Sequence, residues 1–189
     1  MRGDAERWDE RWAGAAPARP EPPDGLGSVS VDLPAAGRAL DVACGMGGQV
    51  VWAARRGLDV VGLDVSPVAV EATWQLARAH GVARRVDVRL HDLDAGLPAD
   101  LGRFDLVICQ RFRAPGIVPA LVAALADGGL AVLSVLSAVG AAEPGPHHAP
   151  PGELAAVVRA TDADVLLSTE GDGRAVVVAR APAGRAHPG

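Results

Sequence analysis

The sequence has 189 residues, a formal net charge of −5, and 49% hydrophobic but only 3% aromatic residues. At roughly 100–200 residues per domain, this length suits one domain with its own core. All 18 basic residues are Arg, and neither Lys nor Tyr occurs. The composition therefore excludes P-loop enzymes, Schiff-base enzymes and short-chain dehydrogenases with a Tyr/Lys pair.

The charge and apolar patterns predict a cytoplasmic protein that binds neither nucleic acid nor membrane. An acidic chain lacks the basic surface that binds phosphate backbones. The N-terminal segment is charged, unlike a signal peptide, and the longest apolar stretch, 128–142, is shorter than the ~20 residues of a membrane span. Two cysteines in apolar runs suit reduced thiols. Whether the protein is a monomer or a homodimer stays open.

Strands and helices alternate along the chain. Segment 1–27 is predicted to hold a short helix and a Pro-rich linker, 28–180 the main domain, and 181–189 a disordered tail. The predicted strands cover 38–43, 59–63, 86–90, 104–109, 130–136, 165–168 and 175–179. Helices are predicted up to 56, over 67–80 and 117–126, and from about 153.

This alternation predicts an α/β fold with a parallel sheet and right-handed crossovers. In such sheets, ligands bind beyond the carboxyl ends of the strands. The motifs that carry chemistry are all expected at such ends.

The first motif, Asp41-Val-Ala-Cys-Gly45-Met-Gly47-Gly48, runs from a predicted strand into a helix. Glycines let the backbone approach a ligand closely, and the helix N-terminus offers free N–H groups. A dinucleotide fingerprint would require glycine at position 50, where Val50 stands. Asp41 would also repel a pyrophosphate, so the motif argues against a NAD(P) oxidoreductase and favours a cationic ligand.

The second motif, Val60-Val-Gly-Leu-Asp64-Val-Ser-Pro67, places an acid at the end of the second strand. Such an acid can accept hydrogen bonds from two ribose hydroxyls. Helix capping alone explains Asp64 less well, because Ser66 already stands in the capping position before Pro67.

These motifs resemble those of the class I S-adenosylmethionine-dependent methyltransferases over about residues 38–136. The resemblance extends to His91-Asp92-Leu93, to Phe104–Cys109 and to the turn at Leu125–Leu130. It implies a Rossmann-like, doubly wound three-layer fold whose mostly parallel seven-stranded sheet has an antiparallel last strand. It also implies S-adenosylmethionine as cofactor and S-adenosylhomocysteine as product.

Residue roles follow from the same resemblance. Asp41 would lie near the methionine amine, Asp64 would hold the ribose, and Asp92 would contact the adenine amino group. Leu63, Val65 and Leu93 are candidates to flank the adenine ring. The implied cofactor-binding residues are Asp41, Ala43, Cys44, Gly45, Gly47, Asp64, Val65, Asp92, Leu93 and Cys109.

A narrower resemblance points to the tellurite-resistance and thiopurine-type branch, which acts on small soft nucleophiles. It rests on Trp8-Asp-Glu-Arg-Trp12 and Pro151-Gly-Glu-Leu154 together with the two motifs above. Members often carry Arg-Asn after the glycines, where this chain has Gly48-Gln49. The departure leaves the substrate open.

No catalytic residue stands out. The weak candidates are Arg111, His147 and His148, and the candidate substrate-pocket residues are Trp8, Trp12, Gln110, Arg111 and Phe112. Arg111 and Arg113 could clamp an anionic substrate, although a solvated loop arginine explains Arg113 at least as well. Adjacent histidines in a Pro-rich loop are more often simply exposed. Trp8 and Trp12 share one helix face, which either forms a lid or packs on the domain. No metal site is predicted, since no third ligand has useful spacing.

The function that the sequence favours is methyl transfer to a small molecule. A nucleic-acid methyltransferase is disfavoured, because the fourth strand ends in Cys-Gln-Arg-Phe in place of an Asn/Asp-Pro-Pro-aromatic run. The alternative is a non-catalytic S-adenosylmethionine-binding sensor or partner subunit.

Overall fold

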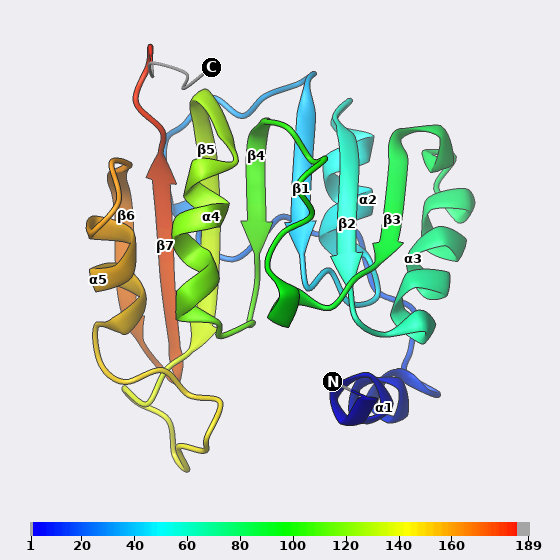
Figure 1. Cartoon of the computed structure of the whole chain (residues 1–189), viewed down its shortest axis with the longest axis horizontal. Helices are drawn as coiled ribbons and strands as arrows, with labels where there is room; N and C mark the ends of the chain where they lie inside the picture. Colours follow the sequence, from blue (N-terminus) through cyan, green and yellow to red (C-terminus); the bar gives the residue numbers. More distant parts are fainter. Residues whose placement is uncertain (1, 185–189) are drawn as a thin grey trace. The chain divides into compact units, whose positions relative to one another are not determined.

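The computed structural model describes residues 2–184, with side chains from Ala5 onward (Figure 1). Most of the predicted tail, residues 185–189, lies outside the described residues. Ala181, at the start of that tail, is buried, and its N–H donates to the carbonyl of Gly129 at 2.9 Å. No helix of the described residues is long and apolar enough to cross a membrane.

Seven strands form one mixed sheet in the order β3-β2-β1-β4-β5-β7-β6. β1 pairs with β2, β2 with β3 and β4 with β5 in parallel, whereas β7 runs antiparallel to both β5 and β6. The predicted Rossmann-like sheet with an antiparallel last strand is thereby confirmed. The strands are β1 (Arg38–Val42), β2 (Asp59–Asp64), β3 (Val86–Leu90), β4 (Phe104–Cys109), β5 (Leu125–Leu136), β6 (Asp164–Gly171) and β7 (Arg174–Arg180).

Five α-helices occur among the described residues. They are α1 (Arg2–Trp12), α2 (Gly48–Arg55), α3 (Pro67–Ala79), α4 (Val118–Ala123) and α5 (Glu153–Arg159). The start of α3 follows local rules: the hydroxyl of Ser66 accepts from the N–H of Ala69 at 3.1 Å, and Pro67 occupies the first turn.

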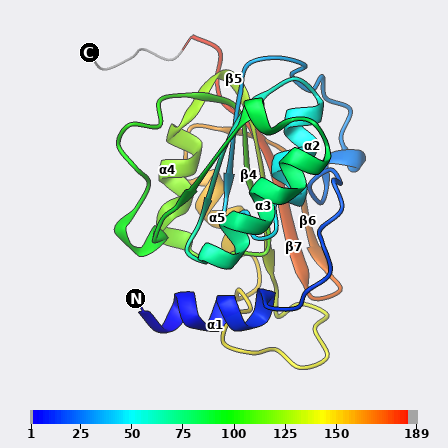
Figure 2. The same ribbon diagram turned by 90° about the vertical axis from the view of Figure 1, so that its right-hand side faces the viewer.

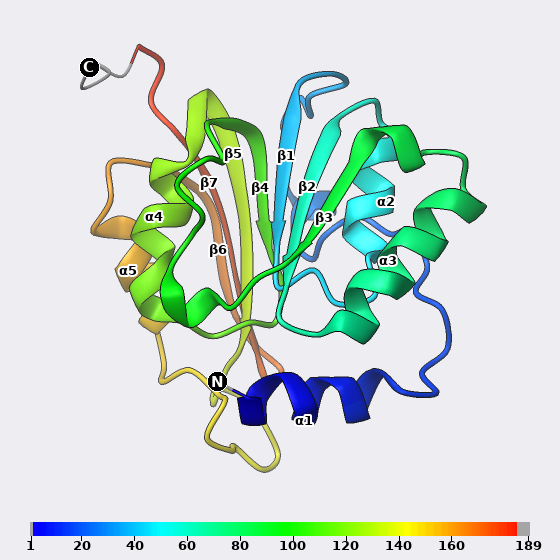
Figure 3. The same cartoon turned by 45° about the vertical axis from the view of Figure 1, so that its right-hand side comes forward.

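The chain forms two compact units. The first contains the residues up to Pro23 and Leu33–Asp100. In it, α2 and α3 pack against each other and against the β1–β3 sheet (Figure 3). Helix α1 contacts α3 and lies near the carboxyl ends of these strands (Figure 2). Helix α1 therefore lies next to the edge of the sheet at which strands β1 to β3 end.

The second unit contains Asp24–Asp32 and the chain from Leu101 onward. Helices α4 and α5 pack on each other and on β5, β6 and β7. The segment Asp24–Asp32 packs on β7: a Cβ atom on Gly25 would lie 2.4 Å from Cγ1 of Val176, and Leu26 is buried. A stretch from the N-terminal part of the sequence thus belongs to the unit that the C-terminal part builds.

One predicted boundary is wrong. The helix expected over 117–126 ends at Ala123, and β5 begins at Leu125 instead of at 130. The pairing of β4 with β5 is interrupted by an irregularity. Phe104 pairs with Leu125 and Leu106 pairs with Leu130, so a step of two residues along β4 corresponds to five residues along β5. Gly128, with φ of +70°, lies in this bulged part of the strand. The Asp-Gly-Gly sequence is therefore a bulge within a strand.

Replacing Phe104 with Ala should lower the free energy of unfolding by about 3–5 kcal/mol, because its ring is fully buried between strand and helix layers. Urea unfolding measures the change. The control is Val68→Ala on exposed α3, which should alter stability by less than about 0.5 kcal/mol. A loss for Phe104→Ala as small as the control's would contradict this core.

Candidate functional site

The loop between β1 and α2 has an unusual backbone. Ala43, Gly45 and Gly47 have φ values of +56°, +53° and +80°. Only glycine adopts such a conformation without cost, so the loop is built by Gly45 and Gly47 and is strained at Ala43. Gly47 is the residue that caps α2.

Thr73 of α3 packs against this loop and forms a hydrogen bond with it. Its buried hydroxyl donates to the carbonyl of Gly45 at 3.0 Å, and a Cβ atom on Gly47 would lie 2.6 Å from the same oxygen. Glycine is therefore required at 47 for space as well as for φ. The sequence analysis missed Thr73, because its role depends on the packing of α3 and no motif marks it.

Asp64, at the end of β2, is held in place by two backbone donors. Its Oδ2 accepts from the N–H of Gly45 at 2.8 Å, and its Oδ1 accepts from the N–H of Ser66 at 2.9 Å. Since a carboxylate offers about four acceptor sites, two bonds leave capacity for further donors. The glycine motif and the acid motif thus meet, as the sequence analysis predicts.

Asp41 lies on the buried part of β1. Its Oδ2 makes no hydrogen bond with any residue that the structure describes. Burial, and secondarily the nearby charge of Asp64, raises the pKa of Asp41 well above its usual value. Burial also raises the pKa of Asp64, against the lowering effect of its backbone donors. Two buried acids with an unmet acceptor favour a cation and disfavour a phosphate.

The other predicted cofactor residues of the first unit differ in burial. Cys44 is buried, with its N–H bonded to the carbonyl of Leu63 at 3.0 Å. Val65 and Leu93 are half-buried. Asp92 is exposed, and its Oδ1 accepts from the N–H of Asp94 at 3.0 Å. All of these residues belong to the first unit.

Helix α1 packs directly on the glycine loop. The ring of Trp12 lies 3.3 Å from the position that a Cβ atom on Gly45 would take, and it stacks on Trp8 with 5.8 Å between ring centroids. Asp9 accepts hydrogen bonds from the hydroxyl of Ser66 and from the N–H of Val68. Of the two predicted substrate-pocket tryptophans, Trp12 is thus placed on the glycine loop of the first unit.

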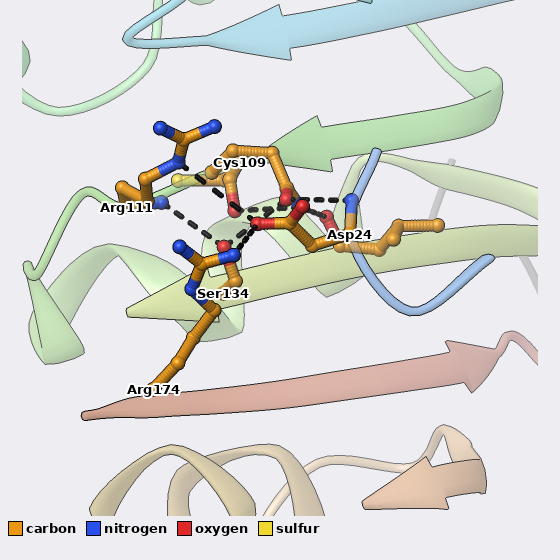
Figure 4. Close-up of polar contacts among 7 residues, drawn as sticks. Asp24, Cys109, Arg111, Ser134 and Arg174 are labelled. Carbon is orange, nitrogen blue, oxygen red and sulfur yellow. Dashed lines mark hydrogen bonds and ion pairs between the residues drawn. The ribbon is translucent and has the colours of Figure 1, made fainter. Parts of the chain in front are cut away.

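In the second unit, a polar network follows the end of β4 (Figure 4). Cys109 is buried, and the next residue, Gln110, accepts through Oε1 from the N–H of Asp24 at 3.0 Å and from the hydroxyl of Ser134 at 3.1 Å. The N–H of Arg111 donates to the carbonyl and the hydroxyl of Ser134. Arg174 donates to Asp24 at 2.7 Å. Asp24 and Arg174 were missed by the sequence analysis.

Phe112 lines a mostly apolar pocket between β4, β5, α4 and α5. Arg113 lies at this pocket and forms a two-pronged ion pair with Glu153, at 2.7 and 2.6 Å. The suggested clamp of Arg111 with Arg113 is therefore not formed, because Arg113 is committed to a carboxylate from α5. The pocket's apolar walls include Ile117, Leu121, Leu133 and Leu154.

The two candidate histidines differ in their surroundings. His147 is exposed, whereas Nδ1 of half-buried His148 accepts from the N–H of Gly145 at 2.9 Å. His148 thus stabilises a turn in its own loop. Among the residues that the structure describes, no group of three or more His, Cys, Asp or Glu side chains could hold a metal ion.

Replacing Asp41 with Asn should stabilise the protein at neutral pH. Because the folded-state pKa of Asp41 lies above its unfolded value, its burial costs stability that grows as the pH rises from about 4 through the folded pKa. Thermal unfolding between pH 5 and 8 should show a gain for Asp41→Asn that shrinks toward acid. Exposed Asp59→Asn is the control; a destabilised Asp41→Asn at neutral pH would contradict the assignment.

Comparisons with known proteins agree with this geometry. Residues 39–129 match a family model described as a methyltransferase domain. The ribosomal protein L11 methyltransferase of Bordetella parapertussis is 34% identical over 112 residues, which are 58% of this chain and 34% of that protein. The ubiquinone biosynthesis O-methyltransferase of Alkalilimnicola ehrlichii is 39% identical over 74 residues, 38% of this chain and 28% of that protein. The chain thus spans about a third of the length of these relatives.

Among solved structures, TehB from Haemophilus influenzae is similar with a TM-score of 0.65 and 18% identity, over 76% of this chain and 57% of that one. At this identity, the similarity shows a shared fold. The matched domain over residues 39–129, the methyltransferase relatives and the shared sheet order together support a class I S-adenosylmethionine-dependent methyltransferase.

Proposed function

We propose that this chain binds S-adenosylmethionine in its first unit and transfers the methyl group to a small-molecule acceptor. The observation that carries the proposal is the position of Asp64. Its carboxylate is oriented by the N–H groups of Gly45 and Ser66 and retains acceptor capacity for ribose hydroxyls.

The residues present fit this cofactor. The unpartnered Oδ2 of Asp41 offers a buried acceptor for the methionine ammonium group. Asp92 would accept from the adenine amino group, with half-buried Val65 and Leu93 beside the ring. Leu63, the third predicted flanking residue, is fully buried in the core and is therefore not a ring contact. When bound, the cofactor supplies an electrophilic sulfonium methyl group.

The chain's contribution to transfer is alignment and exclusion of water. Trp12 on the glycine loop would shield the cofactor-binding residues from solvent. Phe112, at the apolar pocket of the second unit, is the candidate contact for the acceptor. If the acceptor is protonated at working pH, His147 and the Nε2 of His148 are the candidate bases.

The nature of the acceptor is the finer part of the proposal. One relative is named for a ribosomal protein and another for ubiquinone biosynthesis. The names of the relatives therefore include a protein acceptor as well as a small-molecule acceptor. The tellurite-resistance branch is supported by the Trp8–Trp12 and Pro151–Leu154 motifs and by the shared fold with TehB.

Asp64→Ala should weaken S-adenosylmethionine binding by about 1.5–3 kcal/mol, the scale of hydrogen bonds to a charged group. Calorimetric titration measures the affinity. Asp64→Asn keeps the size of the side chain and should lose less binding affinity than Asp64→Ala. The control is Asp59→Ala, which removes an exposed acid of the same strand and should bind the cofactor as wild type does. Equal affinity in wild type and Asp64→Ala would disprove the ribose assignment.

S-adenosylmethionine should raise the melting temperature and NAD should not, because a ligand stabilises the state that it binds. Release of S-adenosylhomocysteine should then follow with at least one acceptor in a screen of thiols, selenite, tellurite and small phenols. Thermal stabilisation without turnover on any of them would favour a non-catalytic S-adenosylmethionine-binding protein. Stabilisation by NAD alone would overturn the proposal.

A further inference from the structure

Two arginines of the second unit approach one carboxylate. Arg174, the first residue of β7, donates through Nη1 to Oδ2 of Asp24 at 2.7 Å, and Nε of Arg111 lies 3.9 Å from the same oxygen (Figure 4). Two guanidinium groups around one carboxylate leave a net positive charge. The cluster can therefore accept a further anion or exchange the one that it holds.

The guanidinium of Arg111 is the less committed of the two. Its side chain is 56% exposed, and the only ion pair that it forms with the described residues is the long contact to Asp24. A guanidinium carries five N–H donors in a planar fork that matches a carboxylate. Arg111 thus has donors that no carboxylate among the described residues of the second unit satisfies at hydrogen-bond distance.

The backbone holds Arg111 in a strained conformation. Its φ is +57°, a region that side chains rarely adopt. The strain persists because its N–H donates to both the carbonyl (2.8 Å) and the hydroxyl (3.1 Å) of Ser134. Backbone strain of this kind clusters at ligand-binding positions, where the surrounding structure fixes a side chain for use.

The main chain of Asp24 is anchored independently of its side chain. Its N–H donates to Gln110 at 3.0 Å, and the following residues pack on β7 through Gly25 and buried Leu26. The carboxylate is 30% exposed and can rotate away while these contacts stay in place. The side chain can therefore yield its position without undocking the segment.

We propose that Arg111 and Arg174 form a binding site for the carboxylate of an anionic acceptor, and that Asp24 occupies this site as an internal carboxylate until the ligand replaces it. That this ligand is the methyl acceptor rests on the proposed function, whereas the carboxylate site itself does not. Arg113 does not belong to this carboxylate site, because its guanidinium already donates two hydrogen bonds to Glu153.

Benzoate and benzamide, which have the same shape but differ in charge, are the probes. Their dissociation constants are measured by saturation-transfer NMR at low salt, with and without S-adenosylhomocysteine. Wild type should bind benzoate more tightly than benzamide. Asp24→Asn, which keeps the bond from its backbone to Gln110, should tighten benzoate binding about fivefold or more, because the competing carboxylate is gone.

Arg111→Gln and Arg174→Gln should each weaken benzoate binding about tenfold or more and leave benzamide unchanged. The matched control is Arg85→Gln, which removes an exposed arginine paired with Asp59 in the first unit and should bind as wild type. Melting temperatures establish that each variant is folded. If Arg111→Gln is too unstable, Arg111→Lys replaces it and should bind benzoate more weakly, because an ammonium group lacks the fork.

The inference is overturned if benzoate binds no better than benzamide in both wild type and Asp24→Asn, or if Asp24→Asn only lowers the melting temperature. Calorimetry with S-adenosylmethionine on the same samples separates the two proposals. Cofactor binding without selective benzoate binding rejects the carboxylate site alone. Selective benzoate binding without cofactor binding rejects the proposed function and retains the site.

Discussion

The hydrogen bond from the N–H of Gly45 to Asp64 is the contact on which the cofactor site depends. It joins the loop after β1 to the end of β2, and it fixes the carboxylate of Asp64 beside the glycine loop. Thr73 holds the other side of the loop through the carbonyl of Gly45. One residue is thus fixed through both its N–H and its carbonyl, so the loop is preorganised before any ligand binds.

Burial of two acids beside this loop carries an energetic cost that a ligand can relieve. Burial and the nearby charge of Asp64 raise the pKa of Asp41, and the chain supplies no hydrogen-bond partner for its Oδ2 among the described residues. A cationic ligand would supply the missing charge. Such a site gives up stability in the free protein in exchange for selectivity, a common pattern at functional centres.

The features that could be predicted are those that neighbouring residues in the sequence encode. The buried apolar runs and the glycine–acid spacing located the strands and brought Gly45 to Asp64. The bulge at Gly128 was misread, because a turn sequence inside a strand is recognisable only through its pairing with β4. Thr73, the pairing of Arg113 with Glu153, and the cluster around Asp24 depend on contacts between residues far apart in the chain. No local pattern encodes them.

The docking of Asp24–Asp32 on β7 also bears on the order of events during synthesis. Asp24 and its partner Arg174 are separated by 150 positions, so the contact cannot form until β7 has left the ribosome. Long-range contacts of this kind are slow to close. The stretch from Asp24 to Asp32 must therefore wait, after α1 and β1 have been made, for the last strand to appear. Completion of the second unit consequently requires β7 and joins segments from both halves of the sequence.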